Sequence, residues 1–329
     1  MKPAFDKDNI AIAFAVDKNY LPYLKYAIKS LVANRKQGNL DILVLHAGEL
    51  DGSSLAAYFN GTQNLSIRFV DISDMAAELA ASYVMKWYFT VAITYRLLLP
   101  DLLPNYERII WLDTDIVVTG DLSGLYYMDL DGCWIGAVGD VGIENGPPKD
   151  VSEVRDIALQ WARKYDFQPW HGYINSGVLL MDLGVLRAAN VRKRLFEVVI
   201  DPLSQWADQD ALNVVCRGHI KYLDRRWNWQ VCKGTGWEIC ADVDVVHFIG
   251  ILKPWHTRLE KAFEIWWKYV DEADLPELYL GCMRELTKMC DDEVRYYEDK
   301  LRKMKHSVSY RLGRALTKPF RAVFRKGKR

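Results

Sequence analysis

The chain has 329 residues, half of them hydrophobic, so it can fold around one large core, and an intrinsically disordered protein is excluded. Its formal charge is zero, but 12 of its 43 basic residues lie in residues 300–329, where there is no acidic residue. Residues 1–299 therefore hold 31 basic against 43 acidic residues, a charge of −12. A basic tail on an acidic body predicts an anionic surface as partner and argues against nucleic acid.

The cysteines and the N-terminus indicate where the protein works. The six cysteines form no C-x2-C pair, which in a chain of this length predicts reduced thiols and argues against a disulfide framework or a zinc site. The N-terminus carries Asp6 and Asp8 and only a short apolar run, unlike a signal peptide. No stretch reaches the ~18 continuous apolar residues that span a bilayer. We therefore expect a cytoplasmic protein.

The first part of the chain alternates strand-like and helix-like segments. Residues 10–16 form a continuous apolar run, typical of a strand buried on both faces, and Asp17 follows it. Such alternation predicts a parallel sheet with helices on both faces, and ligands that bind beyond the carboxyl ends of its strands. The expected strands are 10–16, 41–46 and 65–70, with a further strand-like run at 108–115, and the expected helices are 20–32, 54–59 and 91–99.

The pattern changes after Asp115. Residues 142–150 are rich in Gly and Pro, so we expect the stretch from Asp140 to His171 to be mobile or to face an acceptor. Strands are expected at 134–139, 178–181 and 243–248, and helices at 207–216 and from 257 onward. Tryptophans are more often buried, but five of them are candidates for stacking on acceptor sugars: Trp161, Trp170, Trp227, Trp229 and Trp237.

The last segment has the pattern of a basic amphipathic helix, with a possible break at Pro319. Apolar residues recur at spacings of three and four from Val308 to Phe324, with basic residues between them. Such helices lie in membrane interfaces, where each basic residue near an anionic leaflet is worth on the order of 1 kcal/mol. We expect residues 307–329 to hold the protein on the inner face of the cell membrane. The alternatives are a helix packed on the body and a disordered tail.

The segment from Arg108 to Asp115 is an apolar run that ends in two carboxylates. Residues two apart in a strand point to the same side, so Asp113 and Asp115 can converge on a hard cation that in turn holds a diphosphate. The same residues fit a haloacid-dehalogenase phosphatase, in which a nucleophilic Asp precedes an acid/base Asp by two positions. Context must single out this pair, because Asp-x-Asp recurs at 6/8, 129/131, 208/210 and 242/244.

Five motifs in order together resemble glycosyltransferase family 8. They are residues 13–20 (AFAVDKNY), 110–115 (IWLDTD), 173–181 (YINSGVLLM), 208–210 (DQD) and 247–255 (HFIGILKPW). The likeness covers residues ~9–256. Within the family the chain looks like the bacterial lipooligosaccharide α-galactosyltransferases and, more distantly, the glycogenins.

The resemblance implies an α/β fold of the GT-A type, with a Rossmann-like mixed sheet flanked by helices and a helical C-terminal extension. It places a catalytic domain over residues 1–256. The nucleotide-binding half would be about 9–115, and the acceptor-facing half about 116–256. Residues 257–329 would form the extension that ends in the membrane segment.

The resemblance also assigns roles to individual residues. Asp113, Asp115 and His247 would bind Mn²⁺, with Mg²⁺ as an alternative, and this mixed oxygen and nitrogen ligand set suits Mn²⁺. Gln209, Asp208 and Lys253 would be catalytic. The residues that would contact the UDP-sugar are Ala15, Asp17 and Asn19 at the uridine, Arg96, Thr114, Gly250 and Lys253 near the phosphates, and Asp140, Asn175, Asp208 and Gln209 at the sugar.

Taken singly, several of these residues have a structural explanation. Asp17 and Asp208 could each cap a following helix. His247 could be a hydrogen-bonded histidine at a strand end, and an arginine such as Arg96 on a helix is most often a surface charge. The ordered motifs favour the functional interpretation.

The implied activity is metal-dependent transfer of galactose or glucose, with retained configuration, from a UDP-sugar to a glycan or glycolipid acceptor. Lipopolysaccharide or another surface polysaccharide would be the product. Attack on the same face of the sugar, assisted by the departing phosphate, suits a site where the amide of Gln209 is a poor nucleophile. A sugar-nucleotide-binding protein without turnover is the non-catalytic alternative.

Overall fold

The computed structural model describes residues 1–48, 50–82, 91–143, 152–167, 172–232, 238–257 and 260–306. They fall into two compact units: the first contains Met1–Pro254 and Glu260–Val270, and the second contains helix α11 (Leu275–His306). The predicted membrane segment, 307–329, lies outside the described residues, as do Trp170, His171 and Trp237. Within the described ranges, no helix is both long and apolar enough to cross a bilayer.

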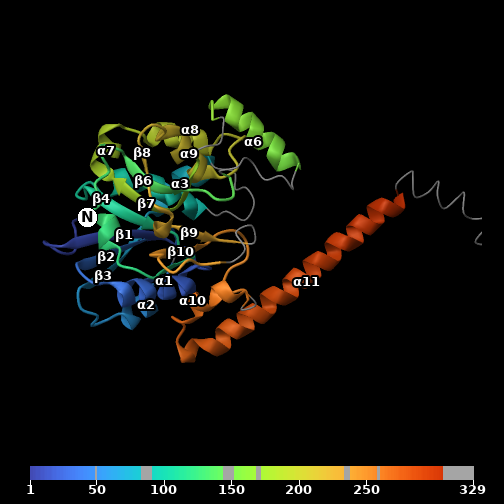
Figure 1. Cartoon of the computed structure of the whole chain (residues 1–329), viewed down its shortest axis with the longest axis horizontal. Coiled ribbons are helices and arrows are strands. Elements are labelled where there is room, and N and C mark those ends of the chain that lie inside the picture. The colour runs from blue at the N-terminus through green and yellow to red at the C-terminus, as the bar shows by residue number, and fades with distance from the viewer. Residues whose placement is uncertain are drawn as a thin grey trace, which may run out of the picture. The chain divides into compact units, whose positions relative to one another are not determined.

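A mixed sheet of seven strands lies at the centre of the first unit as far as the structure describes it. Its order is β3-β2-β1-β4-β7-β6-β8, and in Figure 1 the labels of β3, β2 and β1 lie below those of β4 and β7, with β6 and β8 above them. The continuous apolar run is buried throughout Ile10–Phe14, as predicted for an interior strand. The strands are β1 (Asn9–Ala15), β2 (Asn39–His46), β3 (Leu65–Asp71), β4 (Arg108–Leu112), β6 (Ile135–Gly139), β7 (Ile174–Asp182) and β8 (Ile220–Tyr222).

Strand direction divides this sheet into two halves. β3, β2, β1 and β4 are parallel, as the alternation of segments predicted. β7 runs antiparallel to both β4 and β6, so the mixed sheet implied by the family resemblance is confirmed. Because β7 is reversed, it begins at the edge where β1, β4 and β6 end. Residues after three strands and at the start of a fourth therefore meet there.

A smaller sheet places His247, which is distant in sequence, at the same edge. It consists of β5 (Ile116–Val118), β10 (Val245–Phe248) and β9 (Trp229–Val231). β10 pairs antiparallel with β5, and this register sets His247 opposite Ile116, the residue after Asp115. The sequence predicted β10 but neither β5 nor β9, since three residues are too few to show a period of two.

The helices confirm most of the predicted ones and add others. The segment 91–99 is mainly a 3₁₀ helix, η1, and the stretch from Asp140 to His171, predicted to be mobile or to face an acceptor, contains α6, whose Trp161 is buried. The helices of the first unit are α1 (Leu21–Asn34), α2 (Ser53–Tyr58), α3 (Ser73–Ser82), η1 (Val91–Leu98), α4 (Leu99–Leu102), α5 (Ser123–Tyr126), α6 (Ser152–Lys164), α7 (Leu183–Ala188), α8 (Arg192–Val199), α9 (Ala207–Val215), η2 (Arg225–Trp227), η4 (Lys261–Phe263) and α10 (Glu264–Trp267). η5 (Glu272–Asp274) precedes α11 in the second unit.

Candidate active site

A pocket of about 360 Å³ opens at the sheet edge where β1, β4 and β6 end and β7 begins. Asn19 does not line it: the residue is exposed, and its backbone N–H donates to Asp17 Oδ1 at 2.8 Å. All the other residues predicted for the site line this one pocket: Ala15, Asp17, Arg96, Asp113, Thr114, Asp115, Asp140, Asn175, Asp208, Gln209, His247, Gly250 and Lys253.

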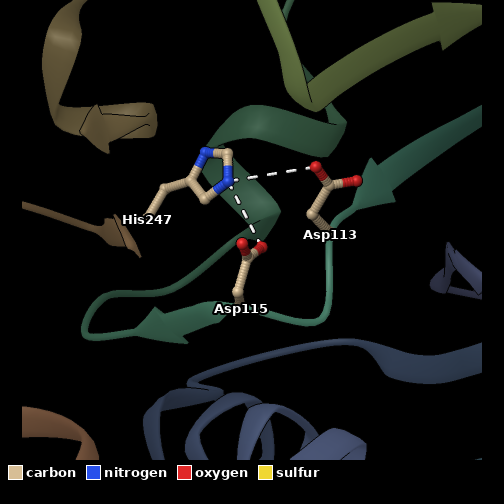
Figure 2. Close-up of side chains that lie close together, drawn as sticks. All are labelled: Asp113, Asp115 and His247. Atoms are coloured by element: carbon tan, nitrogen blue, oxygen red, sulfur yellow. Dashed lines mark ion pairs between the residues drawn. The ribbon is translucent and has the colours of Figure 1, made fainter. Parts of the chain in front are cut away.

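Two carboxylates and one imidazole converge in this pocket (Figure 2). One ligand atom from each of Asp113, Asp115 and His247 lies within 4.8 Å of the others. His247 Nε2 is 3.3 Å from Asp115 Oδ1 and 3.9 Å from Asp113 Oδ2. Two carboxylate oxygens and an imidazole nitrogen suit Mn²⁺, whereas Mg²⁺ prefers oxygen ligands alone. The donor set therefore fits a divalent cation, with positions left for further ligands.

Strand alternation is the wrong reason for this convergence. β4 ends at Leu112 and β5 begins at Ile116, so Asp113 and Asp115 lie in the bend between two strands. The bend is fixed on both sides, because Asp113 N donates to Gly177 O at 2.8 Å and Phe248 N donates to Asp115 O at 2.9 Å. The carboxylates meet because β7 and β10 hold the backbone there.

A basic side chain holds the second oxygen of each carboxylate. Asp113 Oδ1 accepts from Arg96 Nη2 at 2.8 Å and from Trp111 Nε1 at 2.9 Å, and Asp115 Oδ2 accepts from Lys253 Nζ at 2.5 Å. Burial raises the pKa of Asp115, but the charge of Lys253 and the contact with His247 outweigh it and leave this pKa well below its ordinary value. Asp115 is therefore ionised at neutral pH, with one oxygen turned toward His247.

Arg96 is buried, with 2% of its surface exposed, contrary to the usual place of an arginine on a helix. Its guanidinium lies 4.5 Å from the centre of the Trp111 ring, and its Nε is 3.1 Å from Asp208 Oδ2. That oxygen accepts no hydrogen bond from any described residue. Burial raises the pKa of Asp208 to about 6, against the lowering effect of Arg96 and with a further rise from the charge of Asp113. Asp208 thus presents a buried acceptor to the pocket.

Asp17 holds the turn before α1 and also lines the pocket. Its Oδ1 accepts from the backbone N–H groups of Asn19 (2.8 Å) and Tyr20 (3.0 Å), which fixes the turn into α1, whereas the helix itself has Tyr20 at its N-cap and no side-chain cap. The same residue lines the pocket beside Ala15. Its part in the turn therefore leaves Asp17 in the pocket wall.

Asp140, at the end of β6, accepts four hydrogen bonds. Its Oδ1 accepts from Gly142 N (2.9 Å) and Ile143 N (3.1 Å), and its Oδ2 accepts from Asn175 Nδ2 (3.0 Å) and Gln209 Nε2 (3.1 Å). A carboxylate offers about four acceptor positions, so the neighbouring groups already occupy those of Asp140. Gln209 is fixed at its other end as well, because Ser176 N donates to Gln209 Oε1 at 3.0 Å.

Asp208 and Gln209 lie in the first turn of α9, where Asp210 holds the preceding loop. Asp210 Oδ2 accepts from Ser204 Oγ (2.8 Å), Gln205 N (2.8 Å) and Trp206 N (3.0 Å). In this second Asp-x-Asp motif, Asp208 therefore lines the pocket and Asp210 holds the loop before α9. Ala207 has φ +39°, which is rare for a residue with a side chain, and backbone strain of this kind is typical of functional sites.

At two positions in the pocket wall, a residue larger than glycine would strain the backbone or clash with a neighbour. Gly250 has φ +84°, in the left-handed region that favours glycine. At Gly177, a Cβ atom would lie 2.1 Å from His247 Cε1. The imidazole of His247 therefore rests directly on the backbone of β7.

Asn228 and Gln230, which were not predicted as site residues, support the site from behind. Asn228 Oδ1 is 3.0 Å from His247 Nδ1, while Gln230 accepts from Val141 N at 3.0 Å and donates to Gly139 O at 2.8 Å. Both are 1% exposed. The alternation W-N-W-Q over 227–230 could have indicated that Asn228 and Gln230 point to one side of a strand. Only the tryptophans were predicted to have a role, as candidates for stacking on sugars. Trp161 and Trp227 are in fact buried.

Comparison with known proteins decides the family. Residues 11–258 match the sequence profile of glycosyl transferase family 8. The chain belongs to this family. Glycosyltransferase GlyF of Streptococcus pneumoniae serotype 4 is 28% identical over 276 residues, which are 79% of this chain and 61% of GlyF. The lipopolysaccharide 1,2-glucosyltransferase of Escherichia coli K12 is 28% identical over 260 residues, which are 74% of this chain and 72% of the relative.

Solved structures of glycosyltransferases share the fold. The galactosyltransferase LgtC, in complex with donor and acceptor sugar analogues, has a TM-score of 0.66 at 25% identity, over 81% of this chain and 99% of LgtC. The bifunctional glycosyltransferase WbbM has a TM-score of 0.70 at 21% identity, over 86% of this chain and 53% of WbbM, and shows the fold alone. Family 8 membership excludes the haloacid-dehalogenase phosphatase interpretation.

Proposed function

We propose that this family 8 member is a metal-dependent glycosyltransferase that moves galactose or glucose from a UDP-sugar, with retained configuration, to a glycan or glycolipid acceptor. The observation that carries the proposal is the single pocket that Asp17, the cluster of Asp113, Asp115 and His247, and the pair Asp208 and Gln209 all line.

The names of relatives support a role in bacterial lipopolysaccharide or another surface polysaccharide. One is the lipopolysaccharide 1,2-glucosyltransferase of Escherichia coli K12. Another is the lipopolysaccharide 1,3-galactosyltransferase of Salmonella typhimurium, which is 24% identical over 270 residues, or 77% of this chain and 74% of the relative. The two names differ in the sugar, so we leave galactose and glucose as alternatives.

The phosphate end of the pocket is built to bind a leaving diphosphate. A divalent cation such as Mn²⁺, held by Asp113, Asp115 and His247, would act as a Lewis acid on the diphosphate oxygens. Lys253 places a positive charge beside this cluster, and the bare backbone of Gly250 lets an anion approach closely. Positive charge fixed in advance near the leaving group stabilises the transition state without reorganisation.

The other end of the pocket is built to orient the sugar. Asp208 Oδ2 accepts no hydrogen bond from any described residue, so it can accept one from a sugar hydroxyl. The amide of Gln209 is held at both ends and is a weak nucleophile, which favours attack on the same face as the departing phosphate over a covalent intermediate. An α-linked donor should therefore give an α-linked product.

UDP release from a panel of UDP-sugars tests the proposal. With Mn²⁺ present, we expect the protein to hydrolyse UDP-galactose or UDP-glucose slowly without an acceptor, and EDTA to stop the reaction. A suitable glycan acceptor should increase the rate and give an α-linked product; a β-linked product would contradict retention. Binding of UDP and Mn²⁺ with no release from any sugar or acceptor would instead support the non-catalytic alternative.

We also propose that residues 307–329 attach the protein to the anionic inner face of the cell membrane. The segment contains eight basic and no acidic residues. Its deletion should abolish sedimentation with vesicles that contain anionic lipid and leave UDP release unchanged. Vesicles of zwitterionic lipid serve as the control, and full binding by the shortened chain would refute the attachment.

A further inference from the structure

Behind the pocket, an unbroken series of hydrogen bonds connects a cation ligand with the sugar end of the site. His247 Nδ1 lies 3.0 Å from Asn228 Oδ1, Asn228 Nδ2 donates to Asn175 Oδ1 at 2.9 Å, and Asn175 Nδ2 donates to Asp140 Oδ2 at 3.0 Å. All four residues are buried. Asn228 itself does not line the pocket, so it touches the site only through its neighbours.

The direction of this series is fixed at its centre. Gly177 N donates to Asn175 Oδ1 at 3.0 Å, and a backbone N–H can only donate. The amide oxygen of Asn175 must therefore face Gly177 and Asn228, and its amide nitrogen must face Asp140, where the carboxylate accepts. The orientation of Asn175 thus follows from its partners.

The same logic passes through Asn228 to His247. Because Asn175 Oδ1 is an acceptor, the amide group of Asn228 that faces it must be the NH₂ group. The oxygen of Asn228 then faces His247 Nδ1, which must carry a hydrogen to make this bond. A neutral imidazole with its hydrogen on Nδ1 has its lone pair on Nε2, the atom that points toward Asp113 and Asp115.

We propose that Asn228 is a positioning residue, which holds His247 in the Nδ1–H tautomer so that Nε2 is ready to bind a cation. It also joins this ligand to Asp140 and Gln209, which are hydrogen-bonded to each other in the pocket wall. Partners of this kind typically change metal affinity by about 10- to 100-fold when removed. The inference deepens the proposed function and rests on the cation site assumed there.

The test compares Asn228→Ala with Asn228→Asp in the full-length protein. Titration with Mn²⁺ alone, followed by the electron paramagnetic resonance signal of the free ion, should show binding about 10- to 100-fold weaker in Asn228→Ala. Asn228→Asp should bind Mn²⁺ more tightly than Asn228→Ala, because a carboxylate still accepts the Nδ1–H of His247 although it no longer donates to Asn175 Oδ1. Histidine ¹⁵N spectra of the metal-free proteins, with the signal identified by His247→Gln, should show a hydrogen on Nδ1 in wild type and Asn228→Asp and none on Nδ1 in Asn228→Ala.

Asn34→Ala is the matched control. The Asn34 side chain also bridges separate segments, since its Nδ2 donates to Ser30 O, Val118 O and Tyr269 Oη at 2.9 Å each, but it does not line the pocket. Its loss should lower the melting temperature and leave both the Mn²⁺ affinity and the His247 tautomer unchanged. If Asn228→Ala does not fold, Asn228→Ser replaces it with the same expectations.

Two results would overturn the inference. In the first, the alanine and aspartate variants lose Mn²⁺ affinity equally; in the second, the alanine variant keeps both the wild-type affinity and the tautomer. Failure of the wild type itself to bind Mn²⁺ would contradict the proposed metal dependence. The spectra of the metal-free proteins would still decide the role of Asn228 in that case.

Discussion

Asp113→Asn should lower UDP release by at least about a thousandfold, because a bound metal contributes several kcal/mol to transition-state stabilisation and about 1.4 kcal/mol is a factor of ten in rate. The substitution removes the charge of an oxygen that faces His247. The fold should persist, because an amide oxygen can still accept from Trp111 Nε1 and Arg96 keeps its contact with Asp208. UDP release and Mn²⁺ titration measure the effect, with the melting temperature as a check on folding.

Asp131→Asn is the control for this experiment. Asp131 also belongs to an Asp-x-Asp motif and also pairs with a basic residue, Lys221 at 2.5 Å, but it is exposed and lies outside the pocket. Its replacement should change neither rate nor Mn²⁺ affinity. An Asp113→Asn protein that binds Mn²⁺ as tightly as the wild type would remove Asp113 from the cation site.

Asp208→Asn should reduce activity and at the same time stabilise the ligand-free protein. We expect UDP release to fall by about 10- to 100-fold, because a hydrogen bond to a charged group contributes about 1.5–3 kcal/mol and the amide lacks that charge. Burial, however, makes the ionised form unfavourable in the fold and raises the pKa of Asp208 from 3.8 to about 6. At pH 7.5 the neutral amide should therefore raise the free energy of unfolding by on the order of 1 to 3 kcal/mol.

The increase in the free energy of unfolding caused by Asp208→Asn should depend on pH, with a sign that follows from the raised pKa. Between pH 3.8 and about 6 the folded wild type binds more protons at Asp208 than the unfolded chain does, so its stability falls as the pH rises through this window. The advantage of Asp208→Asn should be complete above about pH 6 and should vanish near pH 4. Denaturant unfolding at several pH values measures it.

Asp201→Asn is a control of opposite sign. Asp201 is also buried, and burial alone would raise its pKa. Hydrogen bonds from Lys164 and Tyr165, together with the charge of Lys164, outweigh burial and lower that pKa below its ordinary value. Its substitution should therefore destabilise the protein at pH 7.5. A lower stability of Asp208→Asn at pH 7.5 would show that its ionised form is not strained by the fold.

The sequence predicted the parts of the fold that rest on long local patterns. A run such as 10–16 and a helix such as 20–32 carry enough residues for their period to appear. The strands β5 and β9 have three residues each, and pairing with β10 defines them, so no local pattern could reveal them. The reversal of β7 is likewise a property of the sheet and leaves no mark in a single strand.

Site residues that belong to a sequence motif could be predicted. Residues whose role depends on contacts with distant segments of the chain could not. Thirteen of the fourteen residues taken from the family resemblance line one pocket. Asn228 acquires its place only from Asn175 and His247, which are 53 and 19 positions away in the sequence. Arg96 is buried for a similar reason, because its partners Asp113 and Asp208 come from other segments.

Because β7 is reversed, some pocket residues follow strands and others follow loops. Asp17 and Asp113 follow the parallel strands β1 and β4, whereas Asn175 is the second residue of β7 and Asp208 the second residue of α9, and loops precede both elements. Loops accept insertions and substitutions more readily than the strands they join. A change of length ahead of β7 or α9 can therefore reshape the wall proposed to contact the sugar without moving Asp113 and Asp115. Under the proposed function, such a fold can acquire new sugars while its leaving group stays the same.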